Sequence, residues 1–238
     1  MNAPTQPKRA ALEIITDLAP QPSAERTLLV MLPGAGDHAR EFIKYGFVQA
    51  LRERNLAIDV MAVNAHTGYY LDSSLVDCLE QDVFLPARAN GYRQIWLTGI
   101  SLGGMGSLLY AKKHPDRVRG VILLAPYLGN RARVTAIAAN GGLAVWPTDT
   151  LPSDDNEGAL LAWLKQYQLE ARSQPDVFLG YGVDDRFAEA FTLIEKMIPE
   201  SNLIKTEGGH DWQTWANLWQ HLLDVIPFPV IQNLSQPT

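Results

Sequence analysis

The chain has 238 residues, of which 47% are hydrophobic and 19% are charged, and its formal net charge is −6. This length and composition are typical of one soluble globular domain. The acidic balance, without any Lys/Arg cluster, argues against partners such as nucleic acid or an anionic membrane surface. The single cysteine, Cys78, excludes an intrachain disulfide, and we expect it to be buried in the core.

The first residues, MNAPTQPKRAALEII, contain no long apolar run after their basic residues. No stretch of the chain approaches the roughly 18 apolar residues of a transmembrane helix. The sequence therefore predicts neither a signal peptide nor membrane insertion, and a cytoplasmic location is the expectation. Nothing in it indicates an oligomeric state.

Short apolar runs alternate with segments of helical periodicity along most of the chain. Strands are expected at residues 27–32, 57–63, 94–100, 118–125, 177–181 and 202–206. Helices are expected at residues 37–54, 72–89, 102–113, 187–198 and 211–225. This alternation predicts an α/β fold with a mostly parallel central sheet flanked by helices, because parallel strands are apolar on both faces.

One stretch, residues 130–175, is longer than a simple crossover between two strands requires. It contains the helix-like sequence RARVTAIAA, a helix breaker at residues 140–142 and a second expected helix near residues 157–169. We interpret it as a small helical insertion, a cap over the ligand-binding edge of the sheet, inside a single domain spanning residues 1–238. The alternative is a long structural crossover with no role in substrate binding.

The sequence Gly99-Ile100-Ser101-Leu102-Gly103 fits the pattern G-x-S-x-G. It follows an expected strand and opens an expected helix, which is the context of a serine nucleophile on a sharp turn. The small residues on either side leave room for that turn. A chance match is the alternative, since glycine-rich strand–helix turns also bind phosphate. The flanking strand and helix favour Ser101 as a nucleophile.

A serine hydroxyl needs a neighbouring base to accept its proton. The candidates are His38, His66, His114, His210 and His221. His210 has the best context, because it lies in the sequence GGHDW directly after the last expected strand. His114 ends a helix and His221 lies inside one, whereas His38 and His66 follow strands and stay open as alternatives.

The base in turn needs a carboxylate that orients its ring. Asp184 and Asp185 both follow an expected strand, and we favour Asp185. The resulting order of serine, acid and histidine is the one expected for this kind of fold. Two backbone donors must also hold the developing oxyanion. Leu102 N–H at the start of a helix is one candidate, and Ala35 N–H in the loop LPGAG is the other, with Gly36 as its alternative.

The residues LPGAG (32–36), TGISLGGMGSLLYAKKHPDRVRGVILLAP (98–126), GYGVDDRF (180–187) and EGGHDWQTW (207–215) resemble the α/β-hydrolase superfamily. Within it, they resemble carboxylesterases of the esterase D-like type. The resemblance implies an α/β-hydrolase fold and ester hydrolysis through an acyl-serine intermediate. It also supports Asp185, because the family's acid lies three residues after a glycine such as Gly182. Pro33 departs from the family pattern, in which many relatives have histidine.

The expected substrate is a small-molecule acyl ester, and no cofactor or metal is expected. A thioesterase, a lipase and other acyl-transfer members of the fold remain alternatives, because the same three residues serve all of them. Tyr127, Trp146 and Trp163 are candidates for the lining of an acyl pocket, with packing inside the insertion as the alternative. Trp212 and Trp215 are expected to brace the final helix.

A different class of function is also possible. Gly34, Gly36 and Ala39 fit a dinucleotide-binding pattern of the form G-x-G-x-x-A. That interpretation needs an acid about 20 residues further on, at the end of the next strand. Asp59 is near that distance but lies inside the expected strand. A non-catalytic binding protein on the same scaffold is a further alternative.

Overall fold

The structure is a computed structural model that describes residues 10–148, 151–152, 155–169 and 174–231. Its centre is a seven-stranded sheet in the order β1-β3-β2-β4-β5-β6-β7. The strands are β1 (Ile14–Asp17), β2 (Thr27–Leu32), β3 (Ile58–Val63), β4 (Gln94–Ile100), β5 (Gly120–Leu124), β6 (Asp176–Gly182) and β7 (Leu203–Thr206). Only β1 runs antiparallel to its neighbour, so the predicted mostly parallel sheet is confirmed.

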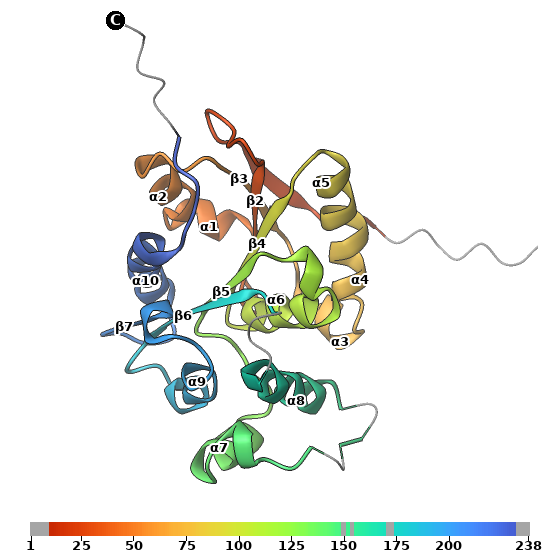
Figure 1. The fold of residues 1–238 in the computed structure, drawn as a ribbon, viewed down its shortest axis with the longest axis vertical. Coiled ribbons are helices and arrows are strands. Elements are labelled where there is room, and N and C mark those ends of the chain that lie inside the picture. The colour runs from red at the N-terminus through yellow and green to blue at the C-terminus, as the bar shows by residue number, and fades with distance from the viewer. Residues whose placement is uncertain (1–9, 149–150, 153–154, 170–173, 232–238) are drawn as a thin grey trace, which may run out of the picture.

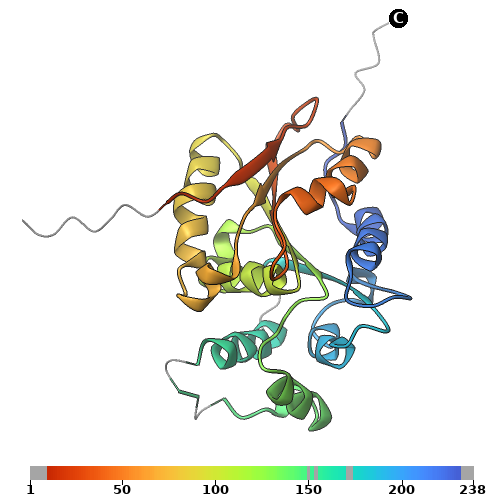
Figure 2. The ribbon, with the colours of Figure 1, turned by 180° about the vertical axis from the view of Figure 1, so that it is seen from behind.

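Helices cover both faces of this sheet (Figures 1 and 2). One face carries α1 (Arg40–Lys44), α2 (Phe47–Glu53) and α10 (Trp212–Val225). The other carries α4 (Leu75–Leu79), α5 (Leu85–Ala89) and α6 (Leu102–Lys113), with α3 (Thr67–Leu71) at its lower end. All six residues of β2 are buried, as expected for a parallel strand between two helical layers.

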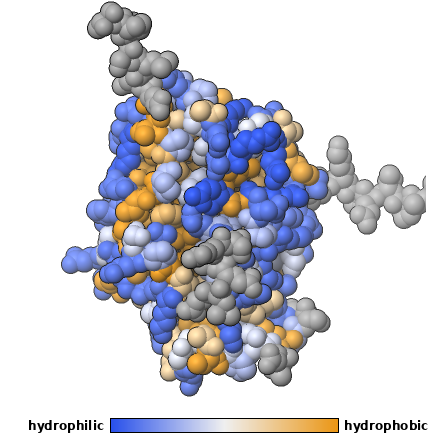
Figure 3. Space-filling view, viewed as in Figure 1, coloured by the Kyte–Doolittle hydropathy of each residue, from blue (hydrophilic) through white to orange (hydrophobic). Residues whose placement is uncertain are grey.

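The long segment between β5 and β6 forms α7 (Arg131–Ala139), a short 3₁₀ turn (Leu143–Val145) and α8 (Asn156–Leu169). These two helices lie together below the sheet, with α9 (Ala188–Glu195) beside α7 (Figures 1 and 2). The surface there is mixed, with apolar side chains gathered next to hydrophilic ones (Figure 3). Both predicted helices of the insertion and the break after the first are present.

Two predicted helices are interrupted. The helix expected at residues 37–54 divides at Gly46, which has a φ of +78° that only glycine adopts freely. The helix expected at residues 72–89 begins at Leu75 and passes through one π-helical turn (Glu80–Phe84) on its way into α5. That turn places the Glu80 carboxylate where Tyr110 Oη–H donates to it at 2.6 Å.

Among the described strands and α-helices, β1 and α3 were not predicted. β1 has only four residues and pairs with β3 at the edge of the sheet, so its sequence carries little pattern. α3 is a single turn that begins after His66, whose Nδ1 accepts a hydrogen bond from Gly68 N–H at 3.1 Å. Cys78 is buried, as expected.

At the turn between β4 and α6, the backbone of α6 lies in close contact with the backbone at the ends of β4 and β2. A Cβ added to Gly99 would lie closer than 3.0 Å to the carbonyl of Gly103, and one added to Gly103 would collide with the carbonyl of Leu32. A Cβ on Gly104 would come within 2.7 Å of Pro126. These three glycines therefore let α6 begin directly above the ends of β2 and β4.

Replacing Gly99 by alanine should lower the free energy of unfolding by about 3 kcal/mol, because the added methyl overlaps backbone atoms that cannot move aside. Urea-induced unfolding followed by circular dichroism measures this. Gly46→Ala is the matched control, since its Cβ meets nothing within 4 Å. Its left-handed backbone should cost only about 1 kcal/mol. Equal losses in the two variants would contradict the explanation.

Candidate active site

Ser101 lies on the sharp turn between β4 and α6, with φ +50° and ψ −113°. This conformation is rare for a residue with a side chain and persists only where the surroundings enforce it. Ser101 N–H donates to Leu124 O at 3.0 Å, and Tyr127 N–H donates to Ser101 O at 2.8 Å. The strained serine is thus fixed from the neighbouring strand β5 and the loop after it.

His210 lies in the loop of residues 207–211, which follows β7 and leads into α10. Its Nε2 is 3.0 Å from Ser101 Oγ, and its Nδ1 is 2.6 Å from Asp185 Oδ2. Because an ionised carboxylate only accepts hydrogen bonds, Nδ1 carries the proton and donates it. The Nε2 of the neutral ring is then free to accept the proton of Ser101.

The imidazole of His210 is also held by two aromatic rings. Phe187 approaches it edge-on with a centroid distance of 5.1 Å, and Trp215 does so with a centroid distance of 5.0 Å. The His210 side chain is only 10% exposed. Packing against these two rings leaves the imidazole little freedom to rotate away from Ser101.

Of the two candidate acids, the structure brings Asp185 to His210. The Asp185 side chain is fully buried, and its Oδ1 accepts a hydrogen bond from Phe187 N–H at 2.8 Å. Asp184 instead faces the backbone of the 207–211 loop, where its carboxylate accepts from Gly208 N–H at 3.3 Å. Asp184 N–H donates to Gly208 O at 3.0 Å. Asp184 therefore ties two loops together, and Asp185 contacts the histidine.

The loop of residues 33–37 lies next to Ser101. A Cβ on Gly34 would be 3.7 Å from Ser101 Cβ. Asp37 N–H donates to Gly34 O at 3.1 Å and closes a tight turn around Ala35 and Gly36, with Gly36 at φ +82°. Within the described residues, the N–H groups of Ala35, Gly36 and Leu102 donate to no acceptor, and their role as donors to a substrate oxygen stays a prediction.

The three pocket candidates lie in different surroundings. Tyr127 follows β5, the strand that pairs with β4, and its Oη–H donates to Glu157 Oε1 at 3.1 Å. Burial, reinforced by the Glu157 carboxylate, raises the pKa of Tyr127. Trp146 O accepts from Lys165 Nζ at 2.8 Å, and the Trp163 ring packs edge-on against Tyr167. These contacts of the two tryptophans lie inside the insertion, and the role of both residues towards substrate stays a prediction.

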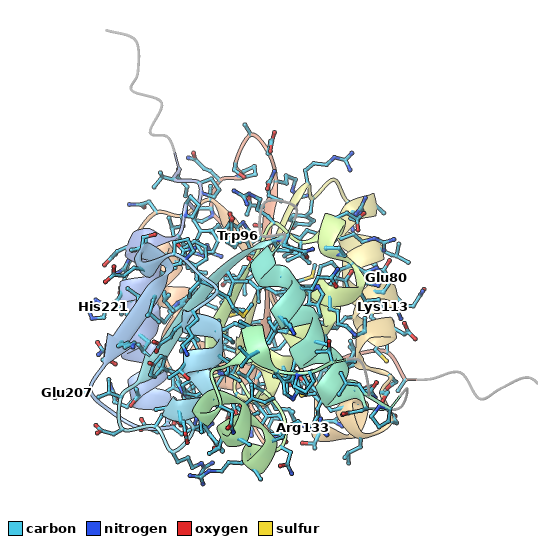
Figure 4. The ribbon with its side chains drawn as sticks, turned by 60° about the horizontal axis from the view of Figure 1, so that its bottom comes forward. Glu80, Trp96, Lys113, Arg133, Glu207 and His221 are labelled. Atoms are coloured by element: carbon cyan, nitrogen blue, oxygen red, sulfur yellow. The ribbon has the colours of Figure 1, made fainter. Side chains whose placement is uncertain are left out.

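The other histidines lie elsewhere. His66 caps α3, His38 N–H donates to the Glu41 carboxylate, and the ring of His114 packs against Tyr110. His221 is exposed on α10, on the same side of the molecule as Glu207 and opposite Glu80 and Lys113 (Figure 4). All five histidines belong to the described residues, and among them only His210 lies within hydrogen-bonding distance of Ser101.

The alternative interpretation as a dinucleotide site gains no support from Asp59. This residue is buried within β3, where it accepts hydrogen bonds from Tyr92 Oη–H at 2.7 Å and from Ala19 N–H at 2.8 Å, and it pairs with Arg26. Its carboxylate is committed to these structural contacts. In the described part of the chain, no cluster of three or more His, Cys, Asp or Glu residues is arranged to hold a metal ion, and no helix has the length and apolarity needed to cross a bilayer.

Two residues of this site, Phe187 and Glu157, were not singled out from the sequence, and Trp215 was expected only to brace the final helix. Phe187 and Trp215 pack on His210, and Glu157 anchors α8 by bonding to Tyr127 and, at 2.8 Å, to Asn130 N–H. Phe187 lies two residues after Asp185, so the acid's own sequence neighbourhood could have indicated it. Trp215 is one helical turn after Trp212. For Glu157, no local signal exists.

Comparison with known proteins agrees with this architecture. The model of the alpha/beta hydrolase fold matches residues 27–195. The chain therefore belongs to the alpha/beta hydrolase fold family, as the sequence motifs predicted. A search of curated proteins returns no match.

Several solved structures share the fold. An S-formylglutathione hydrolase from Staphylococcus aureus is 14% identical, with a TM-score of 0.59 over 86% of this chain and 81% of that one. Est1E from Butyrivibrio proteoclasticus is 18% identical, with a TM-score of 0.58 over 88% and 90% of the two chains. A ferulic acid esterase is 17% identical, with a TM-score of 0.56 over 91% and 98%. At these identities the likeness concerns the fold alone.

Asp185→Asn should lower kcat by about 10⁴-fold, because the amide no longer holds His210 in the tautomer that accepts the serine proton. Asp184→Asn should change kcat by less than about tenfold, because that carboxylate bonds to backbone. Steady-state turnover of a p-nitrophenyl ester by the two purified variants measures the difference. A larger loss in Asp184→Asn would reverse the assignment.

Proposed function

We propose that this protein is a serine hydrolase that cleaves carboxylic esters through an acyl-serine intermediate. The observation that carries the proposal is the continuous hydrogen-bonded chain from Ser101 Oγ through His210 to Asp185, at 3.0 and 2.6 Å. Three side chains from three separate loops meet in this geometry at the carboxyl edge of the sheet. Structures that share the fold include one named as a ferulic acid esterase, which agrees with the proposal.

In the first half-reaction, Ser101 Oγ attacks the acyl carbonyl carbon while its proton passes to His210 Nε2. The carbonyl oxygen becomes an oxyanion, which Leu102 N–H and Ala35 N–H, or Gly36 N–H in its place, stabilise. One such donor contributes about 3 kcal/mol to the transition state. Asp185 keeps the Nδ1 proton in place and stabilises the imidazolium. The C–O bond then breaks, and His210 returns the proton to the departing alcohol.

In the second half-reaction, a water molecule takes the place of the alcohol. His210 Nε2 accepts a proton from the water as its oxygen attacks the acyl carbon of the ester formed with Ser101. The same backbone donors hold the second oxyanion. Breaking the bond to Ser101 Oγ releases the carboxylic acid, and the proton on His210 restores the serine hydroxyl.

We propose that the insertion of residues 130–175 acts as the cap of this site. Glu157, near the start of α8, bonds both to Tyr127 Oη and to Asn130 N–H. Tyr127 is in turn bonded to the backbone of Ser101. Two hydrogen bonds, one between Glu157 and Tyr127 and one between Tyr127 and Ser101, therefore connect the insertion to the proposed nucleophile. We assign to the insertion the role of forming one wall of the substrate site.

Two hollows of very different size are lined by residues that contact the site: Phe187, which packs on His210, lines one, and Met105, whose N–H donates to Ser101 O, lines the other. The cavity beside Tyr127 and Phe187 has a volume of only about 20 Å³, which suffices for a single water molecule. The groove between α4 and α6 has a volume of about 340 Å³. Its lining combines apolar side chains with polar ones: Leu75, Val76, Met105, Leu109, Tyr69, Tyr70, Ser73, Lys112, Lys113 and Asn156. That volume lies in the usual range of small-molecule sites. We assign this groove to the longer apolar substituent of the substrate.

Wild-type protein should hydrolyse p-nitrophenyl esters, and Ser101→Ala should lower kcat by about 10⁶-fold, because the hydroxyl that forms the acyl intermediate is missing. Turnover of a chain-length series and of a matched thioester measures activity and preference together. Wild-type protein that neither turns over any ester nor reacts with a fluorophosphonate at Ser101 would refute the proposed function. A strong preference for the thioester would identify a thioesterase instead.

Leu109→Trp should shift the preference towards short acyl chains, because the indole fills the groove between α4 and α6. We expect kcat/KM for a p-nitrophenyl decanoate to fall at least about tenfold while that for the acetate changes little. Leu85→Trp is the matched control, since Leu85 is exposed on α5 and lines no part of the groove. An unchanged ratio of decanoate to acetate turnover in Leu109→Trp would remove the groove from the substrate site.

A further inference from the structure

One hydrogen bond joins the loop that carries the histidine to the loop that carries the predicted oxyanion donor. Trp212 Nε1–H donates to Asp37 Oδ1 at 3.2 Å. Trp212 is the first residue of α10 and lies two residues after His210. Asp37 is the last residue of the 33–37 loop. The two loops follow β7 and β2, and strands β4, β5 and β6 lie between these two in the sheet.

The indole of Trp212 is itself firmly placed. It stacks on the ring of Tyr45 with a centroid distance of 4.8 Å and an interplanar angle of 7°. The rings of Phe42 and Phe47 approach it edge-on, with centroid distances of 5.5 and 5.8 Å. Helices α1 and α2 therefore fix the plane of the indole, and its N–H has a defined direction.

Asp37 connects this fixed donor to the turn beside Ser101. Its backbone N–H closes the turn onto Gly34 O at 3.1 Å, and its Oδ2 lies 3.0 Å from the position of a Cβ on Gly34. Gly34 in turn packs against Ser101. A shift of the Asp37 side chain would therefore move the turn that presents Ala35 N–H and Gly36 N–H to the substrate.

We propose that Trp212 and Asp37 are positioning residues, which hold the 33–37 loop at the distance from Ser101 and His210 that the oxyanion requires. The inference rests on the proposed function. Trp212 and Asp37 act through the backbone of the loop and touch no reacting atom. Because oxyanion donors must already be in place when the charge forms, loosening the loop affects the transition state more than the bound substrate.

The test compares Trp212→Phe, Asp37→Ala, Asp37→Asn and the double variant of Trp212→Phe with Asp37→Ala, all in the full chain. Phenylalanine keeps a ring against Tyr45 and removes the donor, whereas asparagine keeps an acceptor for the indole. We expect each of the first two variants to lower kcat for p-nitrophenyl acetate about tenfold, with KM within about twofold. The double variant should be no worse than either single variant, and Asp37→Asn should retain most of the activity.

Trp219→Phe is the matched control. Trp219 is on the same helix, is fully buried and also donates its indole N–H, but to Phe47 O in α2 at 3.0 Å rather than to the 33–37 loop. Trp219→Phe should leave kcat unaltered, even if it lowers the free energy of unfolding. A loss of kcat in Trp219→Phe equal to that in Trp212→Phe would show a merely structural effect and overturn the proposal.

A measurement without substrate separates this proposal from the proposed function. Amide hydrogen exchange in a peptide covering residues 33–37 should become faster in Trp212→Phe and Asp37→Ala and stay unchanged in Trp219→Phe. The positioning role is overturned if the wild-type protein is active but the exchange rates or the kcat of Trp212→Phe and Asp37→Ala are unchanged. It is also overturned if the losses of the two single variants add up in the double variant. If the wild-type protein shows no Ser101-dependent turnover, the proposed ester hydrolase activity is refuted. The exchange rates alone then show whether the hydrogen bond between Trp212 and Asp37 holds the 33–37 loop in place.

Discussion

The close approach of α6 to the ends of β2 and β4 is the constraint on which the rest of the site depends. The backbone at the start of α6 passes so close to the backbones of β4 and β2 that no Cβ fits at Gly99 or Gly103. The turn between them forces Ser101 into a strained conformation and lifts its hydroxyl above the sheet. The same approach brings the start of α6, with its free N–H groups, next to the loop that follows β2.

Every other functional group reaches Ser101 from a loop at the same edge of the sheet. The parallel pairing of β2, β4, β5, β6 and β7 puts their carboxyl ends side by side. Asp185 and His210 follow β6 and β7, and the 33–37 loop follows β2. Bonds between loops then refine the positions: Asp184 joins the loops after β6 and β7, and Glu157 joins the insertion to the loop after β5.

The sequence predicted those parts of the fold that are marked by a long apolar run or by a motif of adjacent residues. Buried strands such as β2 and β4 are apolar throughout, and the glycines around Ser101 mark the turn in the chain itself. The edge strand β1 was missed because four half-buried residues carry no periodicity. The break at Gly46 was missed because a glycine within an apolar stripe does not reveal its φ.

The site shows the same division. Ser101 and His210 were favoured from local sequence context, namely the strand–turn–helix around Ser101 and the sequence GGHDW around His210, and the structure brings the two side chains within 3.0 Å of each other. The choice between Asp184 and Asp185 rests on which way adjacent side chains point, which depends on the turn that Asp185 N–H closes onto Gly182 O. The pairing of Trp212 with Asp37 joins residues 175 positions apart, and no local pattern can reveal such a partner.

The hydrogen bond between Ser101 and His210 closes a loop of 109 residues. Contacts of such long range form late in folding. Closing a long loop costs chain entropy, and this cost is offset only by the contacts that form once the intervening elements are in place. Strands β5, β6 and β7 and the whole insertion lie between the two partners. Nascent or partly folded chains that lack these elements therefore have Ser101 and His210 apart, and the contact between the two side chains reports that the whole intervening fold is complete.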